Sequence, residues 1–188
     1  MIDDESLRGI AEGLAIGRDS AFPELVAALE GNVFSGVVRL TGDRHDAEEI
    51  TQEAFVRAFR ALGRYDRDQV RDLRLRPWLW TIALNLCRNR ARDRARRPAT
   101  VTLDRQPEPP GPDSTEEAAI ETVDDAWQER LEALPAHVRT AVVLRHVVGL
   151  AYAEIAQTVG RPVGTVKSDV HRGVARLRAM LIEEGVTV

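Results

Sequence analysis

The amino-acid sequence predicts an all-α fold, built from two small helical modules that an acidic, proline-rich linker joins. Apolar residues recur at helical spacing through most of the 188 residues, and no stretch shows sustained alternation of period two. Four prolines lie among acidic and polar residues between positions 100 and 114, which have little apolar surface to bury. We therefore expect a first module over residues 16–98, a flexible linker over 99–125 and a second module over 126–188.

The composition excludes several classes of protein. The single cysteine, Cys87, excludes an internal disulfide, and we expect it to act as a small apolar helix residue. The four scattered histidines offer no metal-ligand spacing. No apolar run approaches the roughly 20 residues of a membrane span, and the acidic N-terminus lacks the apolar core of a signal peptide. We therefore expect a cytoplasmic protein with no cofactor, no metal and no membrane insertion.

The net charge of −4 conceals three blocks of opposite sign. Residues 71–97 carry nine arginines against two aspartates, a balance of +7. Residues 104–132 carry ten acids against two arginines, which is −8, and residues 134–181 carry seven bases against two acids, which is +5. Two basic blocks that flank an acidic one indicate contact with nucleic acid, although the overall charge argues against it.

Two helices are expected in the first half of the first module. Ser20 has the type and position of an N-cap, with Pro23 in the first turn, and this helix should end at Gly42. Asp46, followed by Glu49 at the third position, has the form of a capping box and should open a helix that ends at Gly63. The inward-facing residues of this second helix have a spacing of four: Ile50, Ala54, Ala58 and Leu62.

A charged loop and a third helix complete the first module. Residues 65–76 are expected to form the loop, and Pro77 should open a helix that ends before Pro98. Its inward-facing residues are expected to be Leu79, Ile82, Ala83 and Leu86.

The second module has the pattern of a helix-turn-helix. Helices are expected over Ala136–Val148, Tyr152–Val159 and Val163–Ile182, with Gly160 at a positive φ in the turn and Pro162 at the first helical position. An apolar stripe should face the core from the last helix, made of Val163, Val166, Val170, Val174, Leu177 and Leu181. An ordinary three-helix bundle is the alternative. The compact turn, the valine stripe and the charge of +5 argue against it.

The other side of the last helix carries the candidate DNA-binding residues. A small residue there lets the helix end approach the groove, and the polar side chains offer donors to bases and phosphates. These residues are Gly164, Thr165, Lys167, Ser168, His171 and Arg172, with Arg176 one turn further along.

Residues 149–156 and 162–168, GLAYAEIA and PVGTVKS, resemble region 4.2 of bacterial sigma factors. The resemblance is closest to the extracytoplasmic-function (ECF) group of the sigma-70 family, and it implies recognition of the −35 promoter element. The family usually has Ser or Thr at the position of Ala151. This difference weakens the cap of the second helix by about 1 kcal/mol without touching the DNA-binding face.

Residues 46–59 are similar to region 2.2, by which sigma factors dock on the clamp helices of the largest subunit of core RNA polymerase. A solvated acidic helix face is the alternative for such a run, but two family motifs in the right order argue against it. The resemblance implies that five residues of this helix bind the polymerase: Glu49, Gln52, Glu53, Val56 and Phe59.

Residues 76–80, RPWLW, and the helix after them resemble regions 2.3 and 2.4. The resemblance implies contact with the −10 element and a flipped base held by the preceding loop. That loop, Asp66–Leu75, is longer than in most relatives, so its role is open. Trp78 and Trp80 are expected to support the core rather than stack on bases. The implied DNA-binding residues are Asn85, Arg88, Asn89 and Arg92.

The sequence therefore predicts an ECF-type sigma factor without catalytic residues, whose partners are core RNA polymerase, promoter DNA and an anti-sigma factor. The resemblance implies a linker that follows polymerase channels, where its acidic charge mimics a phosphate backbone; a plain solvated spacer is the alternative. A stand-alone helix-turn-helix regulator with an N-terminal sensing or dimerisation domain is the alternative function. A nucleic-acid enzyme has no supporting constellation of residues.

Overall fold

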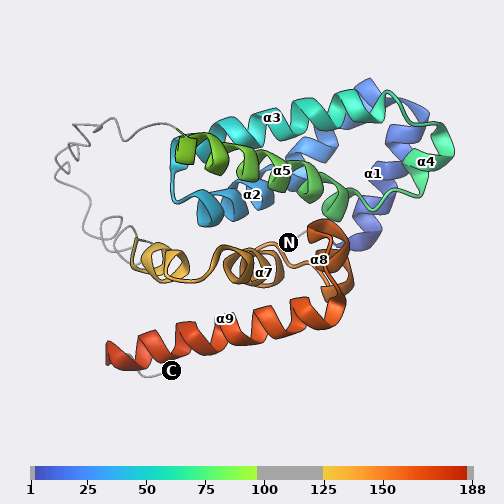
Figure 1. The fold of residues 1–188 in the computed structure, drawn as a ribbon. Coiled ribbons are helices and arrows are strands. Elements are labelled where there is room, and N and C mark those ends of the chain that lie inside the picture. Colours follow the sequence, from blue (N-terminus) through green and yellow to red (C-terminus); the bar gives the residue numbers. More distant parts are fainter. Residues whose placement is uncertain (1–2, 97–124, 186–188) are drawn as a thin grey trace, which may run out of the picture.

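Helices are the only regular elements in the residues that the computed structural model describes, 3–96 and 125–185 (Figure 1). The predicted all-α fold is confirmed, while the acidic linker falls largely outside the described residues. The first half contains α1 (Asp4–Ile16), α2 (Arg18–Thr41), α3 (Arg44–Leu62), α4 (Arg67–Arg71) and α5 (Leu75–Arg96). The second half contains a helical segment at residues 125–132, then α7 (Ala136–His146), α8 (Tyr152–Val159) and α9 (Val163–Glu183).

Helix α1 was not among the expected elements. Asp3 caps it, because its Oδ1 accepts a hydrogen bond from the Ser6 amide at 2.7 Å. The helix packs on α2 and α4 through one apolar face. The residues of that face are Leu7, Ile10, Ala11, Leu14 and Ala15. Their spacing of 3, 1, 3 and 1 is the pattern of an amphipathic helix, so the signal was present in the sequence.

Helix α2 begins earlier than the sequence indicated. Gly17 is the N-cap, Ser20 lies inside the helix, and Pro23 stands beyond the first turn, so the expected cap at Ser20 is wrong. The end was predicted correctly, since Gly42 has a φ of 67°. This positive φ is the conformation that favours glycine at the turn.

The length and hydropathy of α2 are sufficient for a membrane-crossing helix, contrary to the expectation from the sequence. One apolar side of α2 nevertheless packs in the core of the protein, where Leu25, Leu29, Val33 and Val37 are buried. A core helix of a soluble protein passes the same test of length and composition.

Helix α3 is capped by Asp43 instead of Asp46. The Asp43 side chain accepts a hydrogen bond from the Asp46 amide at 2.9 Å, which places Asp46 inside the first turn. The expected inward face is confirmed, because all four of its members are buried. The expected capping box is therefore wrong, and Asp46 and Glu49 have their side chains available for other contacts.

The expected loop of residues 65–76 contains the short helix α4. Asp66 and Gln69 form a capping box at its start, with hydrogen bonds of 2.8 and 3.0 Å. Helix α5 begins at Leu75, two residues before Pro77. Trp80 has no exposed surface, which confirms its role in the core, while Trp78 is partly buried and donates to the Tyr65 hydroxyl at 3.3 Å.

The helix-turn-helix is confirmed in the second half. Gly160 has a φ of 68°, as the turn requires, and Pro162 is the N-cap of α9 instead of its first residue. Val163 is 40% exposed, so it does not belong to the buried apolar stripe. Gly173 faces α7, and a side chain there would collide with Val142.

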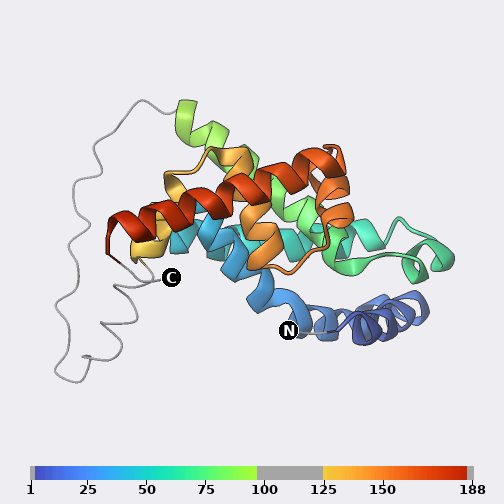
Figure 2. The ribbon, with the colours of Figure 1, turned by 90° about the horizontal axis from the view of Figure 1, so that it is seen from below.

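The two modules pack directly against each other. Helix α7 lies between α2 and α9, and α5 contacts α8 (Figures 1 and 2). Asn32 connects the modules, since it accepts a hydrogen bond from Trp80 Nε1 at 3.1 Å and donates to the Val148 carbonyl at 3.2 Å. Gly36 permits this approach, because a side chain there would collide with Trp80. Arg74 and Glu154 form an ion pair of 2.7 Å across the same seam.

Candidate polymerase and nucleic-acid interfaces

Helix α3 presents the five candidate polymerase-binding residues outside its buried face. Glu49, Gln52 and Val56 are exposed, while Glu53 and Phe59 are half-buried. Glu53 accepts a hydrogen bond from Arg57 Nε at 2.7 Å. The structure thus brings acidic, amide and apolar groups together along one side of a well-packed helix.

Phe59 joins this side of α3 to the start of α2. Its ring packs edge-on against Phe22, with centroids 5.0 Å apart and an interplanar angle of 76°. The guanidinium of Arg18 lies 4.1 Å from the centroid of the same ring. A cation above an aromatic face adds about 0.5–1 kcal/mol at an exposed site. Phe59 is therefore an apolar support whose orientation these contacts fix, and only that orientation was not evident from the sequence motif.

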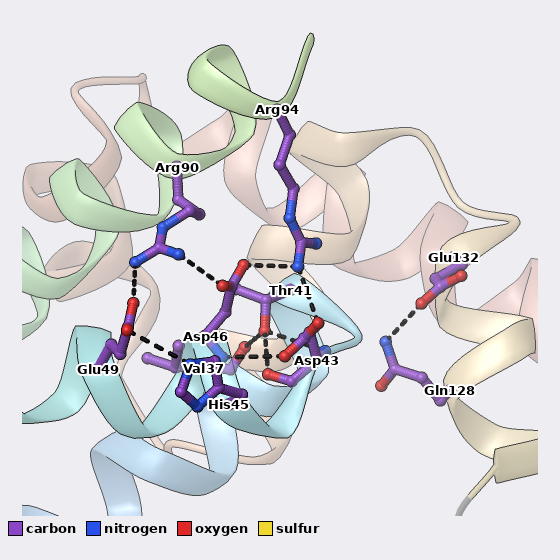
Figure 3. Close-up of polar contacts among 10 residues, drawn as sticks. All are labelled: Val37, Thr41, Asp43, His45, Asp46, Glu49, Arg90, Arg94, Gln128 and Glu132. Atoms are coloured by element: carbon purple, nitrogen blue, oxygen red, sulfur yellow. Dashed lines mark hydrogen bonds and ion pairs between the residues drawn. The ribbon is translucent and has the colours of Figure 1, made fainter. Parts of the chain in front are cut away.

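The first turn of α3 is connected to α5 by ion pairs (Figure 3). Arg90 contacts Asp46 at 2.6 Å and also binds Glu49. Arg94 contacts Asp43 at 2.9 Å and Asp46 at 2.7 Å. The hydrogen bond and charge of Arg90 lower the pKa of Glu49. The Asp46 amide, and secondarily Arg94, lower the pKa of Asp43.

Helix α5 presents the four candidate −10 residues on one exposed side. Arg88 donates to Asn85 at 3.4 Å, and Arg92 donates to Asn89, so each arginine is associated with the amide one turn before it. Arg96 is exposed further along the helix. Its position continues the spacing of four from Arg88 and Arg92, so the three cations lie along one side.

Most other arginines of the first basic block have acidic partners in the structure. Arg71 pairs with Asp68, Arg74 with Glu154, Arg76 with Asp4, and Arg90 and Arg94 with the first turn of α3. The balance of +7 read from the sequence therefore overstates the charge available to a ligand. Most of these partners are distant in the sequence, which is why the charge count missed them.

Helix α9 presents six of the candidate −35 residues, all except Arg176, around a shallow hollow that it forms with α8. Thr165 is half-buried and the other candidates are exposed. The hollow is also lined by Tyr152, which the sequence analysis did not assign to the site. The Lys167 ammonium lies 5.8 Å from the centroid of the Tyr152 ring, and the Arg145 guanidinium lies 5.0 Å from it. Tyr152 thus orients two cations beside the recognition helix.

Asp169 is a fully buried carboxylate on the recognition helix. Its two oxygens bind Arg161 and Arg172, each at 2.5 Å, and His137 lies 3.9 Å away. The contact with Arg161 ties the turn between α8 and α9 to the helix itself. The Arg172 side chain remains 65% exposed, so it keeps donors for a second partner. The sequence analysis counted Asp169 only as a charge.

Two other kinds of site, a reactive thiol and a metal centre, were sought among the described residues. Burial raises the pKa of Cys87 to about 12, so the group is a thiol at neutral pH. Within residues 3–96 and 125–185, no group of three or more His, Cys, Asp or Glu side chains is arranged to hold a metal ion.

Family models match both halves of the chain. The model described as Sigma-70 region 2 matches residues 25–97, and the model described as Sigma-70, region 4 matches residues 124–177. Together they span more than half of the chain. The RNA polymerase sigma-H factor of Pseudomonas aeruginosa is 32% identical over 181 residues, which cover 92% of each chain. The chain belongs to the ECF group of the sigma-70 family.

Other relatives and solved structures agree with this assignment. The ECF RNA polymerase sigma factor SigE of Mycolicibacterium smegmatis is 37% identical over 174 residues, which cover 89% of this sigma factor and 65% of that relative. The structure of CnrH in complex with the cytosolic domain of CnrY has a TM-score of 0.69 and 27% identity. It covers 94% of this chain and 97% of that one. Sigma factors direct promoter-specific transcription initiation, and by family they are initiation factors, not enzymes.

Ala151 is the N-cap of α8 in the region 4 half and makes no side-chain capping bond. Glu154 Oε2 accepts a hydrogen bond from the Ala151 amide at 2.7 Å, which is half of a capping box. Alanine has no side-chain oxygen to complete the other half. The other oxygen of Glu154 binds Arg74, which directly precedes α5, so the same glutamate caps α8 and connects the two modules.

Proposed function

We propose that this sigma factor docks on the clamp helices of the largest subunit of core RNA polymerase through α3. In this proposal α5 then recognises the −10 element, and α9 recognises the −35 element. The observation that supports it is the division of each helix into a buried apolar side and an exposed polar side. The polar side is acidic and amide-bearing on α3, and it is basic on α5 and α9.

The exposed groups suit these three roles chemically. Arginine and lysine donors bind phosphates and base edges, and asparagine offers a donor and an acceptor to unpaired bases. Carboxylates and an amide on α3, next to the apolar Val56 and Phe59, form a mixed surface of the kind that binds another protein. In this proposal the phosphodiester chemistry belongs to the polymerase.

An anti-sigma factor is the second partner that we propose, and the cytoplasm is the proposed location. One solved structure of this fold is the sigma factor RpoE of Bartonella quintana in complex with the anti-sigma factor NepR. It has a TM-score of 0.63 and 22% identity, and covers 85% of this chain and 96% of that one.

Reconstituted transcription tests the proposed function. The purified chain, added to core RNA polymerase, should produce transcripts that depend on both promoter elements, and the chain without polymerase should bind the same DNA weakly. Tight, specific binding by the chain alone, with no stimulation of the polymerase, would instead identify a stand-alone helix-turn-helix regulator.

The docking surface is tested by Glu53→Lys. Glu53 lies on the exposed side of α3, so the charge reversal should weaken co-purification with core enzyme while stability changes by less than about 0.5 kcal/mol. The matched control is Glu12→Lys on α1, which makes the same charge change on an exposed helix position outside the matched regions. Equal retention of core enzyme by both variants contradicts docking through this side of α3.

A further inference from the structure

The arginine-rich half of α5 has two sides with different surroundings. The side assigned to the −10 element is exposed along its length. Arg90 and Arg94 alternate with those residues in the sequence, yet their guanidinium groups are directed to the first turn of α3 (Figure 3). They are four residues apart and therefore lie one above the other on a single side of the helix. The arginines of one segment thus have two separate environments.

Asp46 is at the centre of the contact between α3 and α5. Its side chain is only 6% exposed, and its two oxygens bind different arginines, Oδ1 to Arg90 at 2.6 Å and Oδ2 to Arg94 at 2.7 Å. Each arginine has a second, more exposed acidic partner, Glu49 for Arg90 and Asp43 for Arg94. Arg90 and Arg94 therefore attach α5 to α3 at two points one helical turn apart, which fixes the rotation and the position of α5 relative to α3.

We infer that Asp46 is a positioning residue for recognition of the −10 element: it orients α5 so that the opposite side of the helix faces this DNA. This inference rests on the proposed function of α5. Because Asp46 belongs to the helix proposed to dock on polymerase, it also holds the DNA-binding side in a fixed relation to the docking side. Glu49, a proposed polymerase contact, shares Arg90 with it.

A positioning role and a simple charge effect of Asp46 predict opposite changes in DNA binding when its carboxylate is removed. A carboxylate close to a DNA-binding helix repels phosphates, so its removal should strengthen DNA binding if only its charge matters. If Asp46 orients the helix, its removal should weaken binding of the −10 strand, even though the protein becomes more positive. The sign of the change therefore separates the two roles.

The experiment uses holoenzyme reconstituted with Asp46→Asn, which removes the charge and keeps the shape. Holoenzyme binding to a forked DNA with a single-stranded −10 segment is measured across a salt series. We expect binding to weaken by about tenfold, since hydrogen bonds to charged groups are among the stronger ones. The log–log salt slope should also fall by about 0.7 for each phosphate of the single strand that the protein no longer neutralises. Binding to core enzyme should stay within about twofold of wild type.

The matched control is Glu48→Gln. Glu48 lies on the same helix, is exposed and pairs with Arg44 of its own helix, at 3.4 Å. The substitution removes the same charge without touching α5, so DNA binding should equal or slightly exceed that of wild type. If Asp46→Asn and Glu48→Gln behave alike, the positioning role is overturned.

The double variant Arg90→Gln/Arg94→Gln gives an independent decision if Asp46→Asn does not fold. Both side chains are partly exposed, at 36% and 48%, so their replacement leaves no buried charge except Asp46 itself. The loss of two cations weakens −10 binding by charge alone, so the deciding step is the addition of Asp46→Asn to this variant. We expect no recovery of −10 binding from that addition, and a recovery would overturn the inference. Wild-type binding by the double variant overturns the inference. If wild-type holoenzyme shows no promoter-dependent transcription, the proposed function fails instead.

Discussion

A buried aspartate binds two arginines at α5 and another does so at α9, but the aspartate has a different origin in the two cases. On α5 the carboxylate comes from Asp46 of the neighbouring helix, and the arginines are drawn away from the exposed side. On α9 the carboxylate of Asp169 belongs to the helix itself, and Arg172, at 65% exposed, stays beside the candidate DNA-binding residues. Region 2 thus uses arginines to attach a helix, and region 4 uses them to stiffen a turn.

This difference shows that a basic segment is not automatically a nucleic-acid surface. An ion pair with a buried carboxylate fixes the guanidinium and removes most of its charge from the surroundings. The direction in which the carboxylate lies then decides whether the remaining donors face a ligand. In α5, Arg90 and Arg94 attach the helix while the arginines between them stay exposed. In α9, Arg172 both binds the buried carboxylate and stays exposed to a ligand.

The largest effect is expected for Trp80→Ala, which tests how firmly α5 is anchored. Trp80 has no exposed surface and donates to Asn32, so its truncation should lower the free energy of unfolding by about 3–5 kcal/mol. Urea denaturation measures the change. Trp78→Ala is the matched control, because Trp78 is only partly buried and should cost clearly less. Equal losses would show that the contact between the modules does not anchor α5.

Asp169→Asn should have the next largest effect and should remain local to region 4. The variant weakens two charge-assisted hydrogen bonds and should lower the free energy of unfolding by about 1.5–3 kcal/mol. Transcription should become less dependent on the −35 sequence and keep its dependence on the −10 sequence. Glu183→Gln, at the exposed end of α9, is the control for charge. A defect of the same size at the −10 element would contradict the separation of the two regions.

Lys167→Ala and Arg176→Ala distinguish base contact from phosphate contact along α9. Lys167 lines the hollow beside Tyr152, so its loss should relax the preference among −35 variants, worth about 1–3 kcal/mol against a wrong base. Arg176 lies more than two turns further along and should contact phosphate, so its loss should weaken all variants alike and reduce the salt slope by about one. Holoenzyme transcription on a panel of −35 mutants measures both. The reverse pattern would show that α9 lies differently in the groove.

The smallest effect concerns acid sensitivity, which should reside in the α3–α5 contact. The pKa values of Asp43 and Glu49 are lowered in the folded protein, so these carboxylates stabilise the fold above their unfolded pKa values. That stabilisation is lost as the pH falls through the lowered values, from about pH 4 downward. Asp43→Asn keeps a good N-cap, so the melting temperature of the variant should fall less steeply as the pH is lowered. The free energy of unfolding involved is less than about 1 kcal/mol, as is usual for an exposed ion pair. An unchanged acid profile would contradict this.

The helices and the helix-turn-helix could largely be predicted because their signals are local. Gly42 and Gly160 end helices through their own backbone conformation, and the buried face of α3 follows from a spacing of four. The three sigma motifs placed the candidate residues of α3, α5 and α9 on exposed or half-buried positions before any packing was known. The apolar face of α1 was equally visible, although it was overlooked.

The caps were harder to assign, because several nearby residues compete for the same amides. Asp43 and Asp46 are three residues apart and both are good N-cap types, yet only Asp43 caps α3. Asp46 is instead directed to α5, where two arginines compensate its buried charge. A local pattern cannot choose between them, because the energy that decides the choice comes from a different helix.

By itself, the sequence determined the all-α class, the order of the helices and the family, since these depend on periodicity, turn residues and short motifs. Only the tertiary structure decided which arginines are available to DNA. Arg90 and Arg94 meet their acidic partners across 41 to 51 residues of chain, and such ion pairs exist only once α3 and α5 have packed. Charge along a chain is additive, whereas charge on a folded surface depends on which groups the packing brings within a few ångströms of each other.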